Sequence, residues 1–219
     1  MFRHRIAPLL LLFIPLSLSA QPTTLAVRVI DSQTSEPVAD ARVIVNHGPA
    51  AEPVSAEMEQ RDRQFQPKSL LVSKGSKVNF PNRDATQHHV YSFSPAKSFN
   101  LELFKDQPEA PVVFDKTGVV EIGCNIHDRM QGFILVTDSG LTARTDASGA
   151  ASVPLPADVA GIKQLSLSLW HPRLGNVTET VNFTVSLPAS GPVELGLDLT
   201  PEREKTGRLD GLQKRFQDL

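Results

Sequence analysis

Apolar and polar residues alternate with a period of two along most of this chain. Val78 and Phe80 alternate with polar neighbours, and Val181, Phe183 and Val185 repeat the pattern further along. Alternation over a few residues, bounded by turn residues, is typical of β-strands. The pattern therefore predicts an all-β protein. Two strands are expected within residues 24–46, and others at 70–72, 77–80, 88–93, 112–114, 119–124, 133–136, 141–145, 165–169, 181–185 and 193–199.

The two ends of the chain depart from this pattern. Arg3 and Arg5 precede an apolar run over residues 9–18, and small residues up to Ala20 end it. This order is typical of a cleaved secretory signal, and the run is too short for a membrane span. We expect cleavage near Ala20 and export to the periplasm, without membrane insertion. In residues 201–219, leucine and phenylalanine recur at helical spacing, which predicts a short amphipathic C-terminal helix.

Charge and cysteine content narrow the range of functions. Asp and Glu number 24 against 22 Lys and Arg, and the leader holds two of the arginines. The mature chain is therefore mildly acidic and has no basic cluster, which argues against a nucleic-acid partner. Exported proteins often pair their cysteines in disulfides, but here Cys124 stands alone. Its thiol is expected to be either buried or bound to a metal.

The strongest chemical signal is the segment that starts at Cys124, passes through His127 and ends at Met130. It follows the predicted strand 119–123 and precedes the strand 133–136, so one short loop presents a thiolate, an imidazole and a thioether. These ligands suit copper in both oxidation states, whereas calcium and magnesium require oxygen ligands. Each residue alone has an ordinary structural explanation, Met130 as a core filler above all. Together, at this spacing, they predict a metal site.

A second nitrogen ligand is expected upstream, where Asn82 and Asp84 precede the pair His88-His89. With the Cys-x2-His-x2-Met loop, this stretch resembles the cupredoxins, and the loop resembles that of the amicyanins. The likeness is closer still to the periplasmic proteins labelled methylamine-utilisation proteins. It covers the middle of the chain and implies a Greek-key β sandwich.

The cupredoxin resemblance also implies the ligands of one type 1 copper ion. The spacing from Asn82 and Asp84 favours His88 over His89, although strand alternation alone favours neither histidine. His89 then takes the place of an asparagine that fastens the two ligand loops, and its expected partner is Asn125. The implied ligands are His88, Cys124, His127 and Met130.

The flanking segments carry a weaker resemblance. Residues 24–46 resemble the opening hairpin of transthyretin-like (carboxypeptidase-regulatory-like) β sandwiches, and residues 145–149 and 165–171 resemble later parts of that module. The cupredoxin unit is therefore expected to interrupt one discontinuous β domain. The predicted organisation is a signal peptide (1–20), an N-terminal β segment (21–55), a cupredoxin domain (56–138), a C-terminal β-sandwich domain (139–200) and a helical tail (201–219).

The resemblance implies an electron carrier and not an enzyme, with protein redox partners such as a dehydrogenase or a cytochrome. A multicopper oxidase needs a further histidine cluster, but besides His4 of the leader only His47 and His171 are left. Three alternatives stay open. The same ligands could store or deliver copper, the module could be structural with zinc or without metal, and Cys124 with His127 could form a thiol enzyme.

Overall fold

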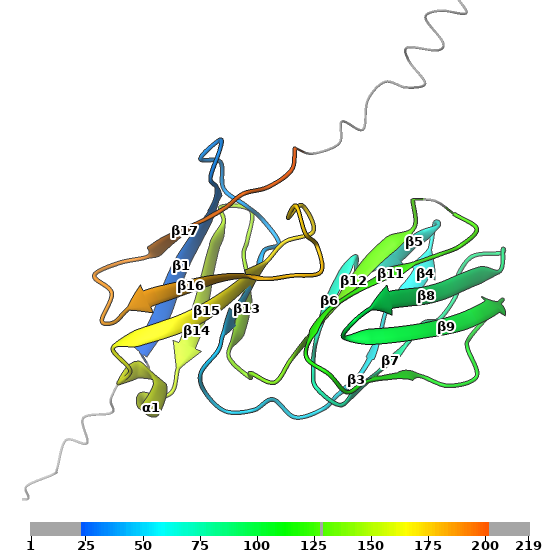
Figure 1. Ribbon diagram of the computed structural model, residues 1–219, viewed down its shortest axis with the longest axis horizontal. Helices are drawn as coiled ribbons and strands as arrows, with labels where there is room; N and C mark the ends of the chain where they lie inside the picture. The colour runs from blue at the N-terminus through cyan, green and yellow to red at the C-terminus, as the bar shows by residue number, and fades with distance from the viewer. Residues whose placement is uncertain (1–22, 128, 202–219) are drawn as a thin grey trace, which may run out of the picture.

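The computed structural model describes residues 23–127 and 129–201. The predicted signal peptide and the predicted C-terminal helix lie outside these residues. Within them the chain forms β-strands and one short helix, so the predicted all-β class is confirmed. No helix in the described part of the chain is long and apolar enough to cross a membrane. Figure 1 shows the strands gathered into two units that lie side by side.

The flanking unit combines the N-terminal strands with the C-terminal third of the chain. Its two sheets have the strand orders β14-β1-β17 and β13-β2-β15-β16. The predicted likeness of this unit to transthyretin-like sandwiches stays a prediction. Its elements are β1 (Thr23–Asp31), β2 (Arg42–Val45), β13 (Thr142–Arg144), β14 (Ala150–Leu155), α1 (Ala157–Ala160), β15 (Gln164–Trp170), β16 (Val181–Ser186) and β17 (Val193–Leu197).

The central unit lies between β2 and β13 in the sequence. A five-stranded sheet of order β6-β12-β11-β8-β9 faces a three-stranded sheet of order β10-β7-β3, and β4 and β5 form a separate hairpin. Its strands are β3 (Ser55–Glu57), β4 (Glu59–Arg61), β5 (Gln64–Gln66), β6 (Ser69–Ser73), β7 (Ser76–Asn79), β8 (His88–Ser94), β9 (Lys97–Phe104), β10 (Val112–Phe114), β11 (Gly118–Gly123) and β12 (Gln131–Thr137).

Strand β12 contributes to the apolar cores of both units. Ile134 and Val136 pack in the cluster inside the central unit. Phe133 and Leu135 point to the opposite face, because successive side chains of a strand alternate, and they pack in the cluster of the flanking unit. The ring of Phe133 contacts that of Trp170 edge-on, with 5.0 Å between centroids. The two units therefore share an apolar contact through the outer face of the five-stranded sheet.

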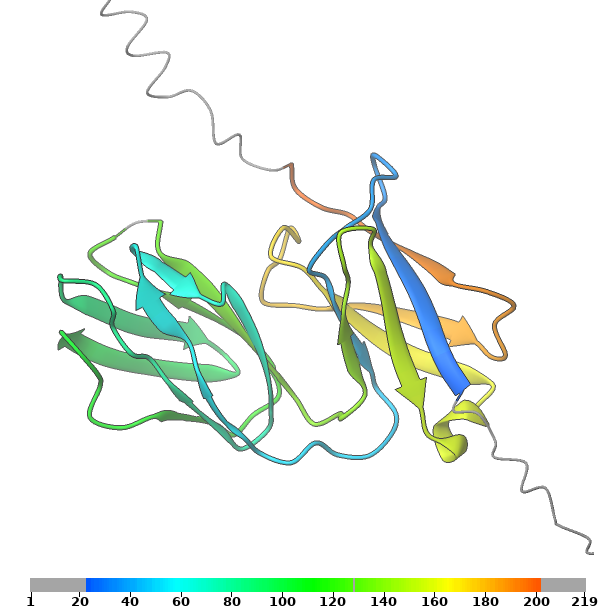
Figure 2. The same cartoon turned by 180° about the vertical axis from the view of Figure 1, so that it is seen from behind.

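The two segments that connect the units are hydrogen-bonded to each other. The Gly140 N–H donates to the Pro49 carbonyl, and the Ala51 N–H donates to the Asp138 carbonyl, each over 2.9 Å. Both connections run between the two units along the same side of the molecule, at the bottom of Figures 1 and 2. The chain thus leaves the flanking unit and returns to it at one place.

Candidate metal centre

Three of the predicted ligands meet at one end of the central sandwich. His88 begins β8, Cys124 follows directly after β11, and His127 lies in the loop that leads to β12. One nitrogen of each ring and the Cys124 sulfur all lie within 4.8 Å of one another. The sulfur is 3.8 Å from His88 Nδ1 and 3.6 Å from His127 Nδ1. Metal–ligand bonds of about 2.0–2.3 Å allow a single ion to bind all three atoms.

The ring of His88 is held in one orientation. Its Nε2 lies 2.7 Å from Oδ2 of Asp84, and the His88 side chain is fully buried. An ionised carboxylate can only accept, so Nε2 must carry the proton and donate it to Asp84. The lone pair of the neutral ring is then on Nδ1, the atom that faces Cys124. This is the tautomer that a metal at the cluster requires.

The downstream loop is closed by two backbone hydrogen bonds. The Cys124 N–H donates to the Met130 carbonyl over 3.2 Å, and the Met130 N–H donates to the His127 carbonyl over 2.9 Å. Cys124 and Met130 are buried in the same apolar cluster, whereas His127 is partly exposed. The Cys124 thiol is therefore enclosed by the core, whereas the imidazole of His127 is partly open to solvent. The role of Met130 as an axial ligand stays a prediction.

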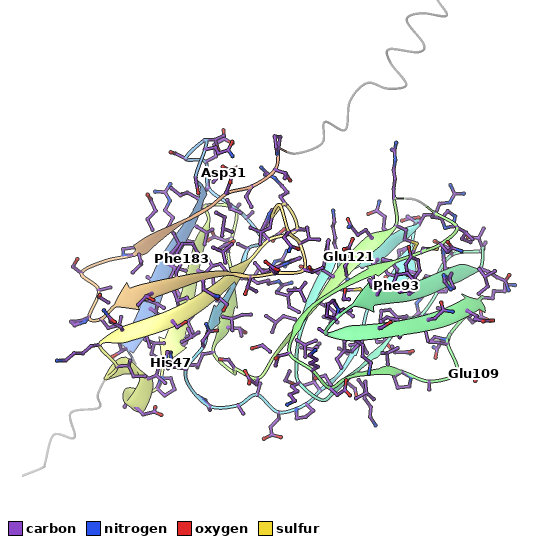
Figure 3. The ribbon with its side chains drawn as sticks, viewed as in Figure 1. Asp31, His47, Phe93, Glu109, Glu121 and Phe183 are labelled. Atoms are coloured by element: carbon purple, nitrogen blue, oxygen red, sulfur yellow. The ribbon has the colours of Figure 1, made fainter. Side chains whose placement is uncertain are left out.

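His89 lies on the opposite face of β8 from His88. Its ring packs 5.5 Å from that of Tyr91, which in turn packs 5.3 Å from Phe93, labelled in Figure 3. Asn125 is exposed, and the described residues form no hydrogen bond between His89 and Asn125. The predicted fastening of the two loops by this pair is therefore not seen. The tilted ring contact with Tyr91 places the imidazole of His89 on the other face of β8.

Asn82 fastens the upstream loop instead. Its side-chain amide donates to the carbonyls of Thr86 and Phe104, over 2.8 and 3.3 Å, and its side-chain oxygen accepts from the Asp84 N–H over 2.9 Å. In the sequence, Asn82 and Asp84 indicate His88 only by their spacing from it. Their contacts show why that spacing matters, because both residues shape the loop that delivers His88 to the cluster.

Comparisons with known proteins find similarity only among solved structures. No family model matches the sequence, and a search of curated proteins finds no significant match. A purple cupredoxin from Nitrosopumilus maritimus is 21% identical, with 37% of this chain and 99% of that chain covered and a TM-score of 0.34. An amicyanin variant is 19% identical, with 44% and 98% covered and a TM-score of 0.35. A copper-containing nitrite reductase from Thermus scotoductus is 24% identical, with 49% and 26% covered and a TM-score of 0.36.

The sandwich and its donor cluster define the class of the central unit. Two facing sheets, with two imidazoles and one thiol brought together at one end, give it a cupredoxin-like arrangement, as the sequence predicted. Its donor set of thiolate and imidazoles, with a thioether nearby in the loop, is that of a type 1 copper site. The narrower likeness to methylamine-utilisation proteins stays a prediction.

Proposed function

We propose that this protein is an exported type 1 copper protein that carries single electrons between protein partners in the periplasm. The observation that carries the proposal is the cluster of two imidazoles and one thiol at the end of the sandwich. Copper bound by such a set supplies a one-electron couple, because thiolate and thioether stabilise Cu(I) without excluding Cu(II). The predicted leader supports export. A dehydrogenase or a cytochrome is the proposed kind of partner.

The residues of the cluster meet the requirements of an electron carrier. His88 and Cys124 extend from strand ends and are 0% and 5% exposed, so their donor atoms are held by a closely packed core that excludes water. A fixed geometry reduces the rearrangement that accompanies a change of oxidation state. His127 is partly exposed and forms the edge through which an electron enters or leaves.

Met130 would supply a weak thioether ligand to the proposed copper. It is 3% exposed and belongs to the apolar cluster that contains Cys124. A long thioether bond in blue copper sites tunes the reduction potential more than it holds the metal. We therefore assign the holding of copper to His88, Cys124 and His127, and the tuning of its potential to Met130.

Repeated redox cycling of the copper-loaded mature protein tests the carrier role. A carrier gives a fast and reversible voltammetric response, and it keeps one copper per chain after many cycles in the presence of a Cu(I) chelator. Slow electron exchange together with release of Cu(I) to the chelator would identify a storage or delivery protein instead. Cys124→Ser is the control for signals that arise from copper bound elsewhere.

A further inference from the structure

The hairpin of β4 and β5 stands apart from the two main sheets and reaches the metal-site end of the central unit. In Figures 1 and 2 it lies beside the β11–β12 loop. Its two turn residues, Asp62 and Arg63, have φ angles of 53° and 56°. A two-residue hairpin turn with both φ angles positive is of the type I′ kind, which usually contains glycine. Side chains in this region cost roughly 1–2 kcal/mol per residue, so the turn needs compensating contacts.

Asp84 supplies those contacts. Its Oδ1 accepts from the Asp62 N–H over 2.8 Å, and its Oδ2 accepts from the Arg63 N–H over 2.9 Å. The same Oδ2 accepts from His88 Nε2 over 2.7 Å. Burial alone would raise the pKa of the Asp84 carboxyl. The hydrogen bonds from Arg63, His88 and Asp62 outweigh this effect and hold its pKa below the usual value.

The hairpin is itself bound to the segment that leads to His88. The Gln60 N–H donates to the Pro81 carbonyl and the Arg83 N–H donates to the Gln60 carbonyl, each over 2.8 Å. The buried side chain of Gln60 donates to the Phe80 carbonyl over 3.1 Å. The hairpin and the upstream ligand segment are therefore joined by backbone and side-chain bonds on both sides of Asn82.

The hairpin also packs on β12, the strand that follows the downstream ligand loop. Phe65 of β5 packs over Gly132 of β12, two residues after Met130, and a Cβ atom at Gly132 would lie only 2.9 Å from the Cβ of Phe65. Phe65 and Met130 belong to one apolar cluster. A single two-stranded element thus contacts the upstream ligand segment and the strand that follows the downstream ligand loop.

We propose that Asp84, held by the turn of the β4–β5 hairpin, is the positioning residue for His88. It fixes the imidazole with Nδ1 toward Cys124 before any metal binds, and its negative charge makes His88 a stronger donor. A carboxylate behind a ligating imidazole orients the ring and raises its basicity, and loss of such a partner typically reduces metal affinity about 10–100-fold. A stronger nitrogen donor favours Cu(II) over Cu(I), so Asp84 lowers the reduction potential. This second effect rests on the proposed copper function.

The experiment compares Asp84→Asn with Asp62→Asn. Asp84→Asn keeps the shape of the side chain and one acceptor oxygen, but it loses the charge and one of the two oxygens that accept from the turn and from His88. Asp62→Asn loses an equal charge at the hairpin turn, yet it keeps the backbone N–H that bonds to Asp84, and asparagine tolerates a positive φ. In the full-length mature protein we measure the tautomer of His88 by nitrogen NMR without metal, and then the copper affinity and the reduction potential.

We expect the metal-free wild type and Asp62→Asn to show the Nε2–H tautomer of His88, and Asp84→Asn to show a mixture. Asp84→Asn should bind copper about 10–100-fold more weakly and at a higher potential, whereas Asp62→Asn should match the wild type. A mixed tautomer in the metal-free wild type, or an Asp84→Asn variant equal to Asp62→Asn in affinity and potential, would overturn the proposal. If the wild type lacks a type 1 spectrum, the copper function fails, and the metal-free tautomer still decides the positioning.

Discussion

The two ligand segments of the central unit are built in different ways. The upstream segment, residues 80–88, is fixed by the side chains of Asn82 and Asp84 and by the β4–β5 hairpin. The downstream loop, residues 124–130, is closed by two backbone hydrogen bonds. Correspondingly, His88 is fully buried, whereas His127 is partly exposed and its neighbour Ile126 is 49% exposed.

This contrast predicts different roles for the two histidines in the proposed carrier. His88 is held by a carboxylate and a packed core, so we expect its geometry to stay the same in both oxidation states. His127 is held mainly through its loop and is partly exposed, so we propose it as the contact edge for a partner. One metal site can thereby be both rigid and accessible.

The most disruptive change removes the thiol of Cys124, which lies within reach of both ligand histidines. Cys124→Ser should abolish the intense colour of the Cu(II) protein, because that colour arises from thiolate-to-copper charge transfer. The visible spectrum after addition of Cu(II) checks this. A variant that keeps the intense band would show that Cys124 is an ordinary buried thiol.

Replacing His88 and His127 by glycine, one at a time, tests whether the two histidines have different roles. His88→Gly removes a fully buried ring together with its hydrogen bond to the Asp84 carboxylate, and a hydrogen bond to a charged group contributes about 1.5–3 kcal/mol. Its loss of stability should therefore exceed that of His127→Gly, whose ring is partly exposed. Chemical denaturation of the two metal-free variants measures the difference.

Added imidazole gives a second comparison of the same two variants. It should restore the colour of His127→Gly at a lower concentration than that of His88→Gly, because only the His127 position is open to solvent. The reverse order of imidazole concentrations would contradict the different roles proposed for the two histidines.

Met130→Leu should have a moderate effect confined to the potential. Leucine preserves the apolar packing around Cys124, while loss of the thioether donor disfavours Cu(II) and raises the reduction potential. Copper should stay bound. Voltammetry of the copper-loaded variant measures the shift, and an unchanged potential would show that Met130 only fills the core.

His89→Asn should have the smallest effect. The ring of His89 lies on the outer face of β8 against Tyr91, away from the ligand cluster, so the visible spectrum should match that of the wild type. If this variant lost its colour while His88→Gly kept it, the upstream ligand would have to be moved by one residue.

The sequence was most informative where the relevant contacts are local. Cys124, His127 and Met130 lie within seven residues, so their spacing alone predicts a shared loop. The choice between His88 and His89 was harder, because both faces of that strand carry apolar residues. The resemblance to a known spacing decided it, and the structure places His88 on the buried face with Val90.

The hairpin could not be read from the sequence for physical reasons. Its turn contains no glycine, although both turn residues adopt positive φ angles, so the usual signal is missing. Its stabilising partner, Asp84, is more than twenty residues away in the chain. Helix α1 was also missed, since four residues carry no periodic pattern.

The central claim, a type 1 copper site formed by these two segments, is tested most directly by one spectroscopic measurement. Cu(II) is added to the purified mature protein, and its visible and EPR spectra are recorded. A type 1 copper site is expected to give an intense thiolate-to-copper charge-transfer band and a narrow parallel hyperfine splitting. A pale solution with the wide splitting of an ordinary tetragonal nitrogen–oxygen site would contradict it.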